Sequence, residues 1–375
     1  MRKTLAVIML LTTACGSSKD GEAPVPNAPA DTPVVPPAPV ALDVPEFGTD
    51  ATRQFKVVGT SAQGLATPRA LAFHPDRHNE LWVVNRTFDG TVTFFDPGTP
   101  QQRTDKRKDA YANHFMEEVS SIAFGARNTF GTCQESNNTY DNAAPPNGFM
   151  GPSLWSADMA IYARVHQGTD DLLGSHLDML HQSPFCMGIA HDHDNAYWVF
   201  DGQNGHVVYY DFQHDHGPGG DDHSDGIIRR YPEAAVKRVP GIPGHMVIDP
   251  SEHWLYVADT GGARIIRLDT RSGRKDAALR ATNEALAEYS RYTGARVETF
   301  ASQNLHQPSG LAIHNGRLFV ADYGTQEIIA YSLDRAKELG RLKVTAQGLM
   351  GITFGPEGDL WYVDGVGNTV VHVIP

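Results

Sequence analysis

The sequence predicts an all-β fold, a β-propeller of six blades with loop and short helical insertions. Two observations predict it. A pattern of three short apolar strands recurs through residues 54–375 at intervals of about 40 to 65 residues, as expected of stacked blades. Glycine is also abundant, at 36 of 375 residues, as a fold with many turns requires. Because one four-stranded sheet cannot bury both of its faces, repeated sheets are expected to stack around an axis.

Each repeat begins with a small or polar residue followed by an apolar strand. These first strands are expected at residues 69–73, 120–124, 187–191, 244–248, 309–313 and 350–354. Second strands, most of them with an aromatic residue and a final Asp or Asn, follow at residues 81–85, 197–201, 255–259, 318–322 and 360–364, with a deviant one at 129–133. Third strands rich in Val and Ile include residues 90–96, 206–211, 264–269 and 327–331. The aromatic residue of the second strand is expected to fill the space between neighbouring sheets.

The last repeat ends at Pro375 after only three strands. Residues 54–59, just before the first repeat, have a strand pattern of their own and can supply the missing outer strand. Such a strand would close the ring and remove exposed sheet edges.

Three insertions interrupt the repeat. Residues 133–153 read as a long loop rich in Asn, Gly and Pro. Residues 166–183 read as a short helix plus loop, with four leucines on one side, and residues 275–292 read as a helix. Loops of this length are usually functional or disordered, so a structured cap is expected around the deviant second repeat.

The N-terminal residues resemble a bacterial lipoprotein signal over residues 1–15, in which Cys15 would carry the lipid. The chain departs from that pattern because Leu11 lies four rather than three positions before Cys15. Ordinary cleavage near Ala14 is the alternative. Residues 16–50 form a proline-rich linker, of which residues 16–46, at about 3.1 Å per residue, could extend on the order of 90 Å. The propeller domain is assigned to residues 51–375.

The net charge of −13 argues against nucleic acid or an anionic lipid surface as the main partner, since both require a basic patch. The lipoprotein-like signal predicts a location outside the cytoplasm, as an outer-membrane lipoprotein or a periplasmic or cell-surface protein. Membrane contact would run through the lipid alone, and the domain is expected to be a monomer. With Cys15 lipidated, Cys133 and Cys186 remain as one pair, and an oxidising compartment favours a disulfide over two buried thiols.

The repeats resemble those of the NHL-repeat family of propellers. The residues that carry the resemblance are the starts Pro308-Ser309-Gly310 and Pro243-Gly244-His245, and the Val-Ala-Asp strand ends at Asp259 and Asp322. The resemblance covers most of residues 54–375 and implies a fold rather than an activity. The related peptidyl-hydroxyglycine amidating lyases bind zinc with three first-strand histidines, and of the six equivalent positions here only His245 matches.

Histidine is the conspicuous residue, with 17 in the chain. One expected site is axial, with His181, His245 and His306 converging from neighbouring blades on a divalent metal. The alternative lies at the rim, with His214, His216 and His223 among aspartates. Imidazole and carboxylate ligands suit Zn²⁺, Mn²⁺ or Fe²⁺, whereas the calcium-like run from Asp221 lacks a final Glu, so calcium is less favoured. Hydrogen-bonded or solvated loop histidines remain the alternative in both places.

Two classes of function stay open. The first is a membrane-anchored propeller that binds an unidentified protein or small molecule. The second is a metal-dependent hydrolase or lyase at the mouth of the central channel, for which no catalytic residue is nominated. Arg69, at the start of a first strand, could bind an anion at that mouth or form a structural salt bridge.

Overall fold

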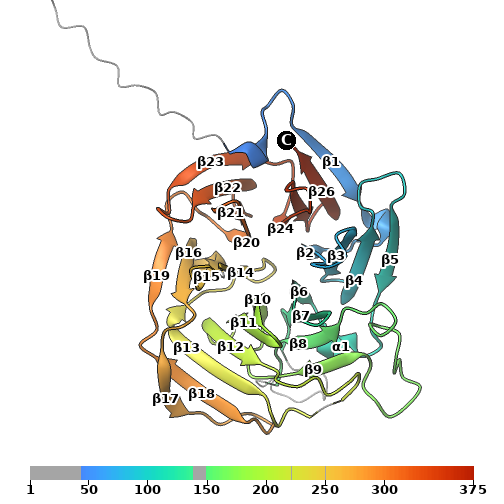
Figure 1. Cartoon of the computed structure of the whole chain (residues 1–375), viewed down its shortest axis with the longest axis vertical. Coiled ribbons are helices and arrows are strands. Elements are labelled where there is room, and N and C mark those ends of the chain that lie inside the picture. Colours follow the sequence, from blue (N-terminus) through green and yellow to red (C-terminus); the bar gives the residue numbers. More distant parts are fainter. Residues whose placement is uncertain (1–43, 138–148, 221, 250) are drawn as a thin grey trace, which may run out of the picture. The chain divides into compact units, whose positions relative to one another are not determined.

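The computed structural model describes residues 44–137, 149–220, 222–249 and 251–375, which form six sheets around an axis and confirm the six-bladed propeller (Figure 1). Blade 1 contains β2 (Pro68–Phe73), β3 (Glu80–Asn85), β4 (Gly90–Phe95) and β5 (Arg103–Arg107). Blade 2 contains β6 (Val119–Phe124), β7 (Thr129–Gln134), β8 (Ser153–Ser156) and β9 (His176–Met179). Blade 3 contains β10 (Cys186–His193), β11 (Ala196–Asp201), β12 (His206–Asp211) and β13 (Ile227–Ala235).

The remaining strands complete the ring. Blade 4 contains β14 (Met246–Asp249), β15 (Trp254–Asp259), β16 (Arg264–Asp269) and β19 (Val297–Ala301). Blade 5 contains β20 (Pro308–His314), β21 (Arg317–Asp322), β22 (Glu327–Ser332) and β23 (Glu338–Lys343). Blade 6 contains β24 (Leu349–Phe354), β25 (Leu360–Asp364), β26 (Thr369–Ile374) and β1 (Gln54–Gly59). Helical turns are α1 (Ala112–Phe115), η1 (Pro45–Phe47), η2 (Ser61–Gln63) and η3 (Thr260–Gly262), and no helix in the described part of the chain could cross a membrane.

The core lies between the blades. The second strands β3, β11 and β15 are buried along their whole length, because neighbouring sheets cover both of their faces. Trp82 on β3 is fully buried and packs against Phe130 on β7 of the next blade, with ring centroids 5.2 Å apart. The aromatic residue of a second strand therefore fills the space between two sheets, as the sequence predicts.

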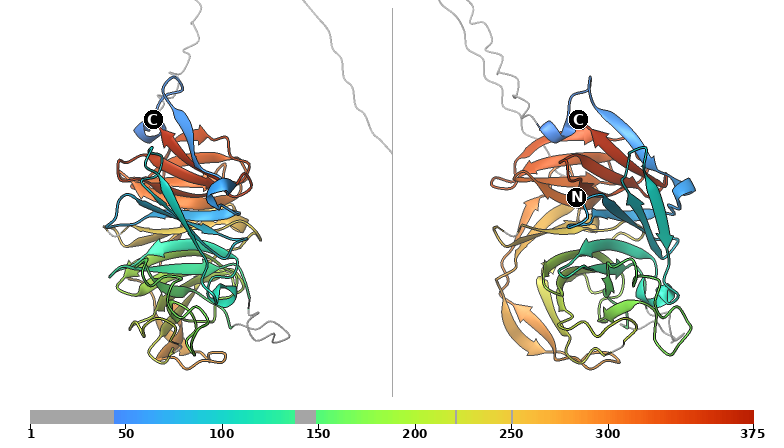
Figure 2. Two further views of the ribbon diagram at one scale, coloured as in Figure 1. Left: turned by 90° about the vertical axis from the view of Figure 1, so that its right-hand side faces the viewer. Right: turned by 45° about the vertical axis from the view of Figure 1, so that its right-hand side comes forward.

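The predicted ring closure is confirmed. β1 pairs antiparallel with β26, with Gln54 opposite Ile374 and Gly59 opposite Val370. Figures 1 and 2 show the two strands side by side at the edge of blade 6.

The folded unit also includes residues that the sequence assigns to the linker. Val44 and Phe47 are buried in the cluster between blades 5 and 6, where the Phe47 ring contacts Phe319 edge-on at 5.7 Å. Glu46 is buried and pairs with Arg317 at 3.0 Å. The expected signal peptide, Cys15 and the rest of the linker up to residue 43 lie outside the described residues.

The helix predicted at residues 275–292 is wrong. This segment forms a hairpin of β17 (Arg274–Ala278) and β18 (Glu288–Thr293), which extends the sheet of blade 3 (Figure 1). β18 pairs in parallel with β13, with Ile227 opposite Glu288. The outer edge of β13 offers unpaired backbone groups, and pairing with them outweighs the helix propensity of the segment, because local propensity is readily overridden by tertiary contacts.

The helix predicted within residues 166–183 is also wrong. Residues 176–179 form β9, the ordinary fourth strand of blade 2, and the preceding residues are turns. Leu177 and Leu180 enter a core cluster with Tyr197, whereas Leu172 is exposed, so these leucines do not share one face. Of the long loop predicted at 133–153, residues 138–148 lie outside the described residues.

The predicted disulfide is confirmed. Cys133 on β7 and Cys186 on β10 are bonded, with Cα atoms 5.1 Å apart and the two residues 53 positions apart in sequence. Both cysteines are fully buried. The bond joins blade 2 to blade 3 and encloses the irregular part of the chain.

Candidate metal centre

The metal site expected at the axial channel does not form there, because His245 is the only histidine among the described residues that line the channel cavity. The first strands line a cavity of about 300 Å³ whose walls are mostly aliphatic. His245 crosses the channel from blade 4, and its Nε2 lies 3.2 Å from the carbonyl oxygen of Ser120 in blade 2. Gly351 in blade 6 lies against the same ring, and a Cβ there would be 2.9 Å from Cα of Ala70 and 3.1 Å from Cε1 of His245, so a side chain would force the backbone of blade 1 to shift. His245 therefore lines this cavity and links blade 4 to blade 2.

The burial of His245 predicts a pH dependence of stability. Burial lowers the pKa of His245 to about 4, and the charge of Arg69 lowers it further against the opposing hydrogen bond to Ser120. The unfolded chain takes up this proton near pH 6.5, so stability should be full above pH 6.5 and fall as pH drops towards 4. Between pH 7 and pH 5 this histidine should account for about 2 kcal/mol of lost stability. Urea denaturation of the wild type and of His245→Asn at both pH values tests it; equal losses in the two proteins would contradict the assignment.

The three histidines of the expected axial site do not form one ligand group. Among the described residues two groups of three ligands occur, and neither contains His245 or His306. The side chain of His306 is exposed, and its backbone N–H bonds Asp322. His181 instead turns towards residues of the predicted rim site. The sequence placed these histidines by their position before each blade, but His181 follows β9 at the edge of blade 2.

The first group comprises His181, His223 and Glu284, with ligand atoms within 4.8 Å of one another. Nδ1 of His181 lies 2.9 Å from Oε2 of Glu284, and these side chains are 2% and 0% exposed. The rings of His181 and His223 meet edge to face at 5.3 Å. Nε2 of His181 lies 3.4 Å from Nε2 of His114 on α1. We call these three residues, His181, His223 and Glu284, the inner triad.

The second group comprises Asp178, His216 and Asp225, again with ligand atoms within 4.8 Å of one another. Nε2 of His216 lies 3.0 Å from Oδ1 of Asp225, whose Oδ2 lies 2.9 Å from Nδ1 of His214. We call Asp178, His216 and Asp225 the outer triad. Its histidine is 22% exposed and its Asp225 26%, so this triad reaches the surface, whereas the inner triad is largely buried.

Three separate segments bring these side chains together. Asp178 lies on β9, His181 just after it, His216 to Asp225 in the β12–β13 loop, and Glu284 in the loop of the β17–β18 hairpin. Gln182 holds that hairpin, because its side chain bonds the backbone of Thr282 in both directions and donates to Oε1 of Glu284 at 2.7 Å. These elements lie around β9, α1, β13 and β18 in Figure 1.

The charge states of the triads follow from burial and pairing. Burial lowers the pKa of His181, and Glu284 opposes that shift, so its imidazole is neutral near pH 7. Burial raises the pKa of Asp178, and the hydrogen bond to His223 opposes it. Partial burial lowers the pKa of His216, but the hydrogen bond and charge of Asp225 outweigh it and raise that pKa overall.

The donor set fits a first-row transition metal better than calcium. Each triad contains at least one imidazole, a ligand that suits Zn²⁺, Mn²⁺ and Fe²⁺, whereas calcium takes oxygen ligands. His223 and Asp225, which the sequence places in a calcium-like run, bond Asp178 and the two rim histidines instead. Asp221, the first residue of that run, lies outside the described residues.

Arg69 has a partner within the protein. The side chain is buried, and its Nη2 lies 3.4 Å from Oε2 of Glu135, while Nη1 donates to the carbonyl of Gly241. Glu135 also lies within 3.6 Å of Arg86 and Arg238. Burial lowers the pKa of Arg69 to about 10, against the opposing charge of Glu135. These contacts match the salt-bridge alternative.

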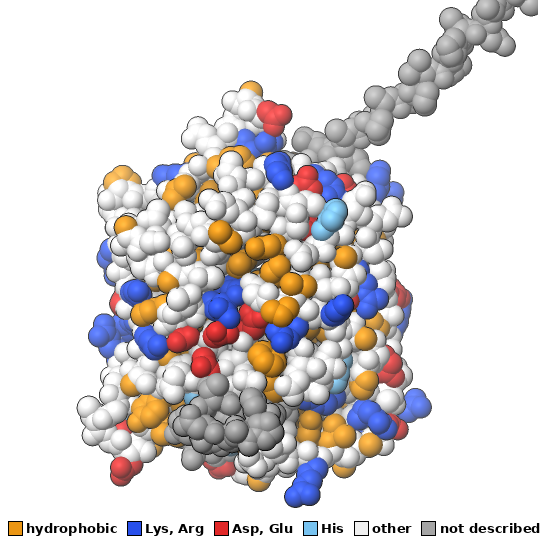
Figure 3. Space-filling model, turned by 180° about the vertical axis from the view of Figure 1, so that it is seen from behind, with side chains coloured by type: hydrophobic (Ala, Val, Ile, Leu, Met, Phe, Trp, Pro, Cys, Tyr) orange, Lys and Arg blue, Asp and Glu red, His pale blue; other side chains and the backbone are white. Residues whose placement is uncertain are grey.

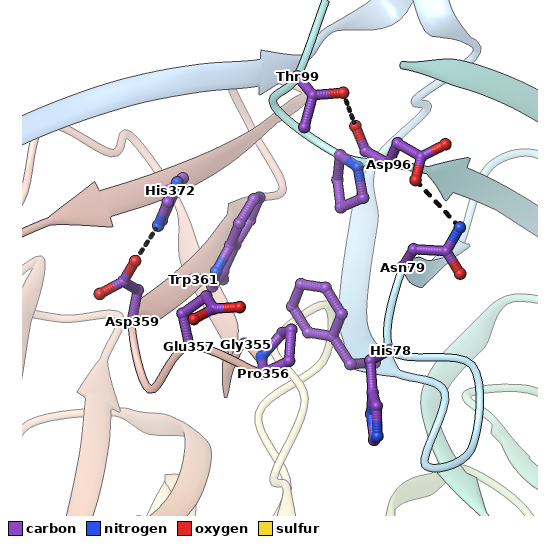
Figure 4. Close-up of a pocket in the computed structure, with 12 residues that line it drawn as sticks. His78, Asn79, Asp96, Thr99, Gly355, Pro356, Glu357, Asp359, Trp361 and His372 are labelled. Atoms are coloured by element: carbon purple, nitrogen blue, oxygen red, sulfur yellow. Dashed lines mark hydrogen bonds and ion pairs between the residues drawn. The ribbon is translucent and has the colours of Figure 1, made fainter. Parts of the chain in front are cut away.

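A separate surface pocket of about 540 Å³ lies between blades 6 and 1 (Figure 4). The His372 ring stacks on Trp361 with centroids 4.1 Å apart, and its Nε2 lies 3.0 Å from Oδ2 of Asp359. On the other side Asn79 donates to Asp96 at 3.0 Å. Two of the labelled carboxylates, Asp96 and Asp359, are thus hydrogen-bonded within the pocket, and the pocket contains no triad of metal ligands among the described residues.

Figure 3 shows the face of the molecule opposite to that in Figure 1, where acidic and basic side chains alternate around the centre. Among the described residues in this view, charges of one sign do not gather into a patch.

Comparison with solved structures shows the fold alone. A streptogramin B lyase structure is 11% identical, and the match covers 86% of this chain and 98% of that one with a TM-score of 0.51. A luciferin-regenerating enzyme is 14% identical over 86% and 95% of the two chains, with a TM-score of 0.53. An auxiliary nutrient binding protein from Bacteroides thetaiotaomicron is 12% identical over 83% and 69%, with a TM-score of 0.53. No protein-family model and no curated protein sequence matches the chain, so the NHL resemblance stays a prediction.

Proposed function

We propose that this chain is an exported, lipid-anchored propeller that acts as a binding module for a divalent transition metal, held at the inner triad. The observation that carries the proposal is the burial of Glu284 against two histidines. A buried carboxylate is costly unless it is paired with a cation or well hydrogen-bonded. Gln182 and His181 satisfy its oxygens in part, and a metal ion beside them would complete the compensation.

The arrangement also has the form of a metal site with outer-shell support. A ligating histidine commonly donates its second ring N–H to a carboxylate, which fixes the ring and its tautomer. Here Nδ1 of His223 lies 3.1 Å from Oδ1 of Asp178, a carboxylate placed to orient this ring as a metal ligand. His181 has the same arrangement with Glu284, either as an outer-shell pair or with Glu284 as a ligand itself.

Export and anchoring rest on separate support. A disulfide between two buried cysteines is typical of an oxidising compartment, and the first 15 residues resemble a lipoprotein signal. Val44 and Phe47 attach the linker between blades 5 and 6. In a ring of six blades that position is opposite the boundary of blades 2 and 3, where the triads lie (Figure 1). A tether at this edge would present the metal centre away from the membrane.

Metal analysis tests the proposal. We expect wild-type protein dialysed against Zn²⁺ or Mn²⁺ to retain bound metal by mass spectrometry. His181→Ala should lower the affinity by more than about 100-fold, since even outer-shell partners are worth about 10- to 100-fold. Glu284→Gln keeps the shape of the side chain and should also weaken binding, which guards against a variant that merely fails to fold.

His306→Ala is the matched control, because His306 is exposed and belongs to neither triad. It should bind as the wild type does. Full binding by both inner-triad variants, with thermal melts unchanged, would refute a metal at the inner triad.

A second candidate function is metal-dependent hydrolysis or lyase chemistry at the same place, rather than at the channel mouth, where the described residues form no group of three metal ligands. It is favoured by the partial exposure of His216 and Asp225, which gives a substrate a route to a metal with an open coordination position. Turnover by the metal-loaded wild type that His181→Ala abolishes would support this function over simple binding.

A further inference from the structure

One buried oxygen near the inner triad has no hydrogen-bond partner in the part of the chain that the structure describes. The carboxylate of Asp178 is 1% exposed, and its Oδ1 accepts hydrogen bonds from the backbone N–H of Met179 at 2.6 Å and from Nδ1 of His223 at 3.1 Å. Its Oδ2 is buried and has no hydrogen-bond partner among the described residues. Leaving a buried carboxylate oxygen unsatisfied is expensive, so such an atom calls for an explanation.

The neighbours of Asp178 supply one. His216 and Asp225 each place a ligand atom within 4.8 Å of an oxygen of Asp178 and of each other. Two carboxylates and one imidazole carry a formal charge of −2 when the imidazole is neutral, which one divalent cation would balance. Repulsion between two carboxylates this close disfavours the triad without a cation between them.

We propose that the outer triad is a second cation site, so that the cluster binds two divalent transition-metal ions side by side. The proposal rests on the proposed function for the first ion and adds an ion that this function does not require. With one nitrogen and two oxygens, the outer donor set suits Mn²⁺, Fe²⁺ or Zn²⁺. Because His216 and Asp225 are partly exposed, the outer ion is the one that exchanges with solvent and meets a ligand.

The two sites are linked through one hydrogen bond. Asp178 would bind the outer ion through Oδ2 while its Oδ1 holds Nδ1 of His223, a ligand of the inner ion. Asp178 is thus a ligand of one ion and a positioning residue for the other. Asp178→Asn should therefore remove the outer ion and also weaken the inner ion by about 10- to 100-fold. A residue with a purely structural role would not change the affinity of both sites in this way.

Metal stoichiometry distinguishes the two sites. The full-length protein and its variants would be dialysed against Mn²⁺ and, separately, Zn²⁺, and bound metal counted per chain. We expect two ions in the wild type, one in His216→Ala, one in His181→Ala, and two in the control His306→Ala. His216→Ala is a mild change because this side chain is partly exposed, and circular dichroism would check the fold of each variant.

Other metal counts would separate the second site from the proposed function. One ion that His181→Ala removes and His216→Ala retains would overturn the second site and leave the proposed function standing. One ion that His216→Ala removes and His181→Ala retains would establish the outer triad and overturn the inner one. No bound ion in the wild type would overturn both.

Discussion

Deletion of residues 1–59 is expected to leave a chain that cannot fold stably, whereas deletion of residues 1–43 should leave the thermal midpoint unchanged. The longer deletion removes β1, the outer strand of blade 6. It exposes the backbone edge of β26 and opens the ring between the first and last blades. It also removes the buried side chains of Val44, Phe47 and Val58.

The size of the effect follows from burial. Each of those apolar side chains contributes about 1.5 to 3 kcal/mol on full burial. With the lost strand pairing, the longer deletion should cost on the order of 5 to 10 kcal/mol, comparable to the whole stability of an ordinary domain.

Thermal melts followed by circular dichroism measure this loss of stability. A third truncation, of residues 1–48, separates the contribution of β1 from that of residues 44–47. This intermediate deletion keeps β1 but removes Val44, Glu46 and Phe47, so its midpoint should fall between the other two. If deletion of 1–59 melts at the wild-type temperature, β1 does not close the ring. If the protein lacking residues 1–48 also melts at the wild-type temperature, the contacts of residues 44–47 contribute nothing to stability.

Loss of the Cys133–Cys186 disulfide is the second large effect. The bond closes a loop across 53 positions of sequence, and the chain-entropy relation then predicts a loss of roughly 4 kcal/mol in the free energy of unfolding. The double variant Cys133→Ser, Cys186→Ser tests this by urea denaturation. Both positions are fully buried, so Cys133→Ala, Cys186→Ala is the matched control for burying two hydroxyl groups.

The two double variants should lose similar amounts of stability if the cross-link dominates. A much smaller loss in the alanine variant would attribute the effect to the buried hydroxyls. Because the bond encloses β9 and the residues up to Cys186, its loss should also loosen the position of His181 and weaken metal binding.

Most of the fold could be predicted because it depends on short-range patterns repeated along the chain. The first strands, the buried second strands and the closing strand lie where apolar runs and turn residues place them. The aspartate at the end of a second strand is a local device of the same kind. Asp364 accepts hydrogen bonds from the backbone of Gly348, Val366 and Gly367, and so holds the turn that follows its own strand.

The insertions could not be predicted in the same way. The segment at 275–292 has enough Ala, Leu and Glu to resemble a helix, but the free edge of β13 captures it as a strand. A local pattern contains no information about a partner edge more than 50 residues away in sequence. For the same reason Glu284 was missed, since its place in a supposed helix gave no sign that it faces His181.

By itself, the sequence determined a six-bladed all-β ring, its closure by residues 54–59 and the pairing of its two remaining cysteines. It also singled out His181, His216 and His223 as residue types able to bind metal. Only the tertiary structure decided which of them meet, because His181 and Glu284 are 103 positions apart and contact through an inserted hairpin. The repeated strands are specified by their own local patterns, whereas the site combines the end of β9 with the β12–β13 loop and an inserted hairpin, so it depends on how these three segments pack. In the packed structure His245 bonds the carbonyl of Ser120 and Arg69 pairs with Glu135. The same packing places carboxylates beside the other histidines.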